Sequence, residues 1–124
     1  MSMTRDDWES RQYIDRLTDS WHRCSGRYPS KNEVIRLLRI EKKWHLKPAD
    51  KTMKANSFKF RCYSRFVVDE LVRLIRSSEE EDPIRIIYQF MDFMDDMVTY
   101  SDNKTTWVFA GVMRDAARDI LDLI

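Results

Sequence analysis

The amino-acid sequence predicts an all-α fold, a compact bundle of four to five helices in which the helix over residues 83–100 is central. Only two glycines and three prolines occur in 124 residues. Neither glycine follows Asn or Asp, so the dipeptides that most often turn a β-hairpin are missing. Apolar residues instead recur every three or four positions, as on one face of a helix. The length fits one helical domain over residues 1–124.

Five helices follow from this period and from the residues that begin and end helices. Ser30 and Glu33 have the spacing of a capping box, in which each side chain accepts a hydrogen bond from the other's backbone N–H. Asp82 followed by Pro83 is a typical helix start, since proline lacks the N–H that the first turn leaves unpaired. The expected helices cover residues 4–24, 30–47, 57–77, 83–100 and 105–123.

In the first and last helices, the sequence pattern that predicts the buried face is less regular. In the first, the predicted apolar stripe consists of Tyr13, Ile14, Leu17, Trp21 and Cys24. His22 adjoins this stripe, and an imidazole at the surface or at the boundary of the core is expected there. In the last, Gly111 lies inside a helix, which costs about 1 kcal/mol relative to alanine. Close approach of a neighbouring helix is the expected reason for this glycine.

The helix over residues 83–100 is apolar around most of its circumference. One face contains Ile84, Ile87, Tyr88, Met91, Met94 and Val98. A second face contains Ile86, Phe90, Phe93, Met97 and Tyr100. Such a helix is covered on several sides, either as the central helix of the bundle or by another subunit. Its methionines are interpreted as core filling, with a partner interface as the alternative.

Charge is unevenly distributed along the chain, although the whole carries a net charge of only +1. Residues 23–76 contain fifteen basic and five acidic side chains, a net charge of +10. Residues 77–124 contain four basic and eleven acidic side chains, a net charge of −7. Such asymmetry indicates a polyanionic partner, an acidic partner, or two halves that cover each other.

The basic segment is the first candidate binding surface. Aromatic residues lie among its cations, and this combination suits contact with phosphates and unpaired bases. The alternative is that the aromatic rings belong to the core and the cations form a solvated face. The predicted contacts to nucleic acid, or to a nucleic-acid-binding protein, are Lys42, Lys43, Lys47, Lys51, Lys54, Lys59, Arg61 and Arg65.

A protein interface is the second candidate. It uses the second apolar face of the helix over residues 83–100 and the acidic side chains beside it, and it suits an adaptor, an inhibitor or a homodimer. The residues predicted for this interface are Phe90, Phe93, Met97, Asp92 and Asp96.

Enzyme chemistry is not expected. The aspartates of the last two helices lie opposite the apolar faces and have no histidine among them, which argues against a metal site of the kind found in helical bundles. No phosphate-binding glycine loop or HExxH motif is present, and neither Cys24 nor Cys62 belongs to a nucleophile arrangement. No cofactor and no metal are therefore predicted.

The expected location in the cell follows from the cysteine spacing and from the distribution of apolar residues. The two cysteines are far apart, and neither a secretory signal nor a membrane-spanning stretch is visible, which indicates a cytoplasmic protein with no membrane contact. We therefore expect a small regulatory protein that docks on a macromolecule. A short helical sequence with few motifs is of the type found among accessory proteins of phages and mobile elements, although no residues carry a resemblance to a family.

Overall fold

The computed structural model describes residues 5–45 and 55–124, and within them the side chains of residues 8–40, 65–122 and 124. This part of the chain forms five helices and contains no strand. The helices are α1 (Arg5–Ser25), α2 (Lys31–His45), α3 (Ala55–Ser77), α4 (Pro83–Tyr100) and α5 (Lys104–Leu123). The predicted all-α class is confirmed, and every helix end lies within two residues of its expected position.

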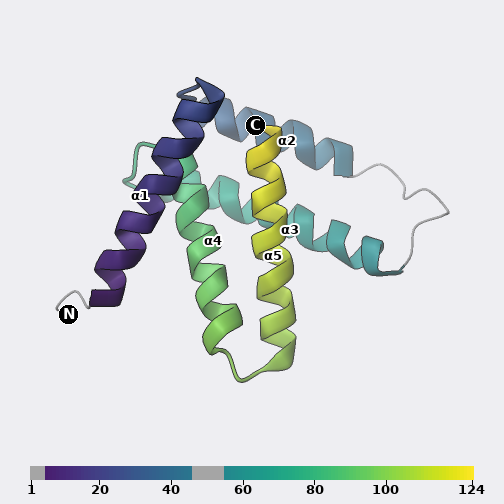
Figure 1. Cartoon of the computed structure of the whole chain (residues 1–124). Coiled ribbons are helices and arrows are strands. Elements are labelled where there is room, and N and C mark those ends of the chain that lie inside the picture. Colours follow the sequence, from purple (N-terminus) through teal and green to yellow (C-terminus); the bar gives the residue numbers. More distant parts are fainter. Residues whose placement is uncertain (1–4, 46–54) are drawn as a thin grey trace.

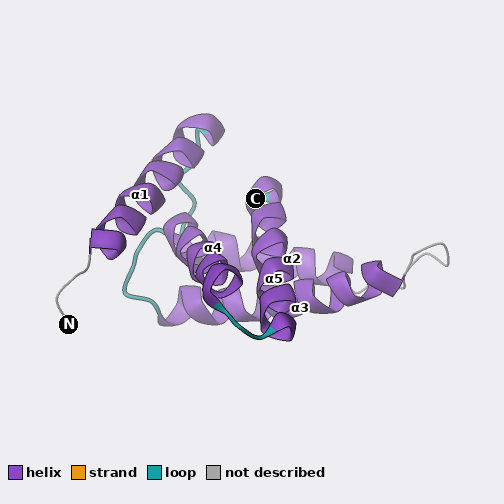
Figure 2. Cartoon of the chain, turned by 60° about the horizontal axis from the view of Figure 1, so that its bottom comes forward, coloured by secondary structure: helices purple, strands orange, loops and turns teal. Residues whose placement is uncertain are grey.

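The helices stack in two layers (Figure 1). α4 and α5 form an antiparallel pair that crosses in front of α2 and α3, which form the second layer. α1 packs along the outer side of α4, as Figure 2 shows from another direction. α4 therefore contacts α1, α3 and α5, in agreement with its predicted central place. No described helix has an apolar stretch sufficient for crossing a bilayer.

The main core lies between α2, α3, α4 and α5. Its fully buried side chains come from apolar positions of all four helices, so that each helix buries one stripe against the others. The largest members are Val34, Leu38, Val67, Val68, Leu71, Ile75, Ile84, Ile87 and Met113.

α1 contributes little to this core, and its predicted stripe is rotated. Ile14 is buried as expected, but Tyr13 and Cys24 are exposed. The buried positions are Ile14, Thr18 and His22, which follow one another at intervals of four residues. Burial of Thr18 is tolerated because its hydroxyl donates a hydrogen bond to the Ile14 carbonyl at 2.8 Å. The prediction of a surface or boundary position for His22 is wrong, since only 8% of this residue is exposed.

The helix starts are built largely as predicted. The Asp82 carboxylate accepts a hydrogen bond from the Ile84 N–H at 3.0 Å and caps α4, with Pro83 in the first turn. Ser30 Oγ accepts from the Glu33 N–H at 3.2 Å, which is one half of the predicted capping box. The Glu33 carboxylate does not complete the box as expected but accepts a hydrogen bond from the Arg27 guanidinium at 3.1 Å. Asn103 caps α5, a role that the sequence interpretation missed.

Gly111 has more room than the sequence implied. A Cβ added at this position would lie 3.8 Å from Cγ2 of Val98 in α4, an ordinary van der Waals distance. Gly111→Ala is therefore expected to raise the free energy of unfolding by about 1 kcal/mol, the cost of glycine in a helix interior. Urea denaturation measures this change. Gly26→Ala is the control with the opposite sign, because Gly26 has a φ of 64°, which strains a residue with a Cβ.

Candidate functional site

Most side chains of the predicted basic surface lie outside the described residues. Lys47, Lys51 and Lys54 lie outside the described residues. Of the remaining five predicted positions, Arg65 has a described side chain, and it is exposed near the middle of α3. The side chains that also fall outside the described residues are those of Lys42, Lys43, Lys59 and Arg61.

An apolar groove opens immediately after Arg65, between α3, α4 and α5. Its volume is about 620 Å³. Ile86, Phe90 and Phe93 project from successive turns of α4, so the second apolar face predicted for this helix forms one side of the groove. Its principal apolar lining residues are Phe66, Ile86, Phe90, Phe93, Met94 and Phe109. We call this surface the α3–α5 groove.

Two phenylalanines at the α3–α5 groove remain open to solvent. Phe93 is 61% exposed and Phe66 is 53% exposed, whereas Phe90 is buried at the groove's base. The Phe66 ring meets the Phe109 ring edge to face, with centroids 6.0 Å apart. This contact holds Phe66 against α5 while leaving more than half of the residue uncovered. The arrangement combines fixed apolar walls with exposed aromatic edges.

The polar edge of the groove is largely neutralised. Arg73 donates to both carboxylate oxygens of Glu70, one of them at 3.1 Å. This hydrogen bonding from Arg73 lowers the pKa of Glu70 below its usual value and keeps the carboxylate charged. The remaining polar lining consists of the neutral side chains of Ser77, Ser78 and Gln89. The groove is thus suited to an apolar surface with a polar border.

No protein-family model matches this chain, and the curated proteins and solved structures that were compared with it also gave no match.

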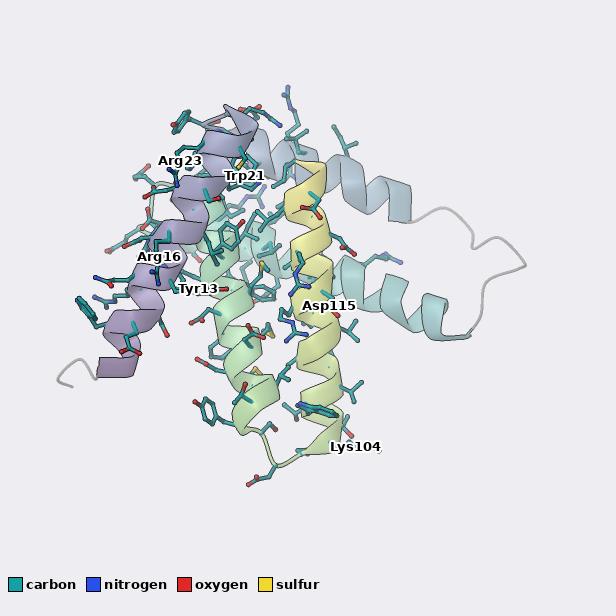
Figure 3. All side chains as sticks on the ribbon, viewed as in Figure 1. Tyr13, Arg16, Trp21, Arg23, Lys104 and Asp115 are labelled. Atoms are coloured by element: carbon teal, nitrogen blue, oxygen red, sulfur yellow. The ribbon has the colours of Figure 1, made fainter. Side chains whose placement is uncertain are left out.

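The other predicted interface residues do not join the α3–α5 groove. Met97 packs partly buried against the main core, and Asp96 is exposed. Asp92 lines a separate cleft of about 270 Å³ beneath α1, where Tyr13 points from α1 toward α4 (Figure 3). Burial raises the pKa of Asp92, and the neighbouring carboxylates of Asp96 and Asp95 raise it further. Of the five residues predicted for the interface, two therefore line the α3–α5 groove, one lines the separate cleft and two line neither.

The aspartates near this cleft are partly paired by arginine. Arg114 donates to Asp95 at 2.5 Å and to Asp115 at 3.3 Å, so it joins α4 to α5. Arg118 lies 3.9 Å from Asp115. Within the described parts of the chain, no three His, Cys, Asp or Glu side chains gather in a way that could hold a metal ion. The pattern is that of helix-surface ion pairs.

Proposed function

We propose that this protein is a small non-enzymatic binding module that docks on a partner protein through the α3–α5 groove. The observation that supports the proposal is the pair of exposed rings, Phe66 and Phe93, at the edge of a groove whose base is apolar. Large exposed aromatic side chains that converge on one concavity are typical of interface anchors. We place the protein in the cytoplasm, where the exposed thiol of Cys24 would stay reduced.

The occupant that best suits this groove is an amphipathic helix with an acidic polar face. A helix presents apolar side chains at intervals of three and four residues, which matches a groove lined along successive turns of α4. The sequence of α3 contains five basic and two acidic residues, a net charge of +3. Arg73 is engaged by Glu70, and the other exposed arginines described on this helix are Arg65 and Arg76. Acidic side chains on the partner would complement them.

Paired substitutions in the groove test the proposal. Phe66→Ser combined with Phe93→Ser is expected to lower the amount of partner captured from lysate of the native host by at least about tenfold, because truncating interface anchors removes most of the binding energy. Val108→Ser is the matched control, since Val108 is exposed on α5 but does not line the groove. Circular dichroism and melting of each variant verify that folding is retained.

Two results would overturn this proposal. Equal capture by wild type and the double variant would exclude the groove as the docking site. A wild-type dimer that becomes monomeric in the double variant, measured by analytical ultracentrifugation, would identify a second copy as the occupant instead.

The basic stretch over residues 42–65 supports a second candidate function, contact with nucleic acid. Eight cations within 24 residues would release counterions from a phosphate backbone, so the affinity would fall steeply with salt. Nuclease treatment of the lysate separates the two proposals. Capture that disappears with nuclease and high salt, yet survives the two phenylalanine substitutions, would favour nucleic acid.

A further inference from the structure

His22 lies where the end of α1, the connection to α2 and the start of α4 meet. Its Nε2 is 2.7 Å from Oδ2 of Asp82, and its Nδ1 is 2.7 Å from the Arg27 carbonyl oxygen. The Tyr28 ring stacks on the imidazole with a centroid separation of 4.6 Å and an interplanar angle of 9°. The Trp21 ring meets it edge-on at 5.4 Å. The imidazole is therefore stacked on Tyr28, contacted by Trp21 at nearly a right angle, and held at both nitrogens.

Both hydrogen-bond partners of this imidazole are acceptors. A backbone carbonyl has no proton to donate, and an ionised carboxylate has none either. Each ring nitrogen must therefore carry a hydrogen for both bonds to form, which defines the imidazolium cation. The neutral ring has one N–H and would place a lone pair against one of the two acceptors.

The surrounding charges favour this cation. Burial lowers the pKa of His22, but the hydrogen bonds to Arg27 and Asp82 and the charges of Asp82 and Asp19 outweigh it, and the pKa is raised above 6.5. Two arginines on the elements that meet at His22 are engaged by other carboxylates. Arg85 donates to Asp15 at 2.9 Å and to Glu80 at 3.1 Å. Arg27 pairs with Glu33, and Arg23 is exposed at the end of α1.

The described part of α1 buries few side chains. Of its described residues, only Ile14, Thr18 and His22 are buried, and two of these three are polar. Trp21 reaches toward α5 (Figure 3), where its indole N–H donates to the Leu121 carbonyl at 3.3 Å. The Asp15–Arg85 pair adds one exposed contact to α4. Loss of the His22 contact would therefore remove a large share of what fixes the end of α1.

We propose that His22 and Asp82 form a protonation-dependent latch that fastens the C-terminal end of α1 to the N-terminus of α4. The latch is complete below pH 6.5, because the imidazolium donates to both acceptors. It is lost as the pH rises through the elevated pKa of His22, when the ring gives up one N–H. Release of α1 would open the 270 Å³ cleft that Tyr13 and Ile14 cover against α4 and α5.

Nuclear magnetic resonance tests the latch directly in the folded chain. The His45→Gln background leaves His22 as the remaining histidine. The His22 ring is expected to carry hydrogens on both nitrogens at pH 6 and to titrate with a midpoint above 6.5. Asp82→Asn keeps a good capping residue but removes the negative charge, so the midpoint should fall. A wild-type midpoint at or below 6.5, or one unchanged in Asp82→Asn, would overturn the proposal.

Amide hydrogen exchange provides the second readout. Protection factors in the last turns of α1 are expected to drop as the pH rises through the His22 midpoint, while those in α3 and α5 stay constant. His22→Gln has no titrating ring and should show constant α1 protection over the same range. Equal protection of α1 on both sides of the wild-type midpoint would show that protonation does not control its attachment.

Discussion

Ile87→Ala is expected to lower the free energy of unfolding by about 2–5 kcal/mol, the range found when a large aliphatic side chain is truncated in a packed core. Ile87 is completely buried on α4, within the core shared with α2, α3 and α5. The substitution removes three carbon atoms from an interior that rigid helices surround, so the resulting cavity collapses only partly. Urea denaturation with linear extrapolation measures the loss.

Ile40→Ala is the matched control for this prediction. It deletes the same atoms from α2, but Ile40 is 57% exposed. Its expected change lies within about 0.5 kcal/mol of zero, as is usual for a surface substitution. Equal destabilisation by the two variants would contradict the assignment of α4 to the centre of the core.

The sequence was sufficient for the helices because their signals are local. Residues that mark helix starts, such as Ser30, Asp82 and Pro83, act within a turn of their own positions, and the helix starts could be derived from them. The core positions of α4 followed from period alone, since Ile84, Ile87 and Met94 recur at helical spacing and are buried. Periodicity identifies an apolar face even when the helix that will cover it is unknown.

The candidate sites were harder to predict because they depend on contacts between distant segments. His22 and Asp82 are 60 positions apart, and the sequence signal at Asp82 indicates only the start of a helix. A signal for His22 did exist, since it continues the four-residue spacing of Ile14 and Thr18, but apolar patterning overlooks polar residues. Phe90 and Phe93 were predicted to share an interface, yet Phe90 is buried while Phe93 is exposed. That difference in exposure depends on the positions of α3 and α5 around α4.

Asp82→Ala is expected to lower the free energy of unfolding by about 3 kcal/mol at pH 6. Asp82 has two structural roles, since Oδ1 caps α4 and Oδ2 accepts from His22. Loss of an N-cap costs about 1 kcal/mol, and loss of a hydrogen bond to a charged group costs about 1.5–3 kcal/mol. The buried imidazolium is also left without its counterion. Urea denaturation at several pH values measures the effect.

Asp82→Asn separates these two roles. Asparagine caps helices about as well as aspartate, so this variant should lose only the charge-dependent part, about 1–2 kcal/mol at pH 6. Because the raised pKa of His22 makes its contribution a low-pH effect, the difference between wild type and Asp82→Asn should shrink as the pH rises above 6.5. If the difference in free energy of unfolding between wild type and Asp82→Asn instead grew with pH, the imidazolium would not be the form that closes the latch. If Asp82→Asn were as stable as wild type at every pH while Asp82→Ala still lost about 1 kcal/mol, the carboxylate would act on α4 alone, and α1 would be attached independently of protonation.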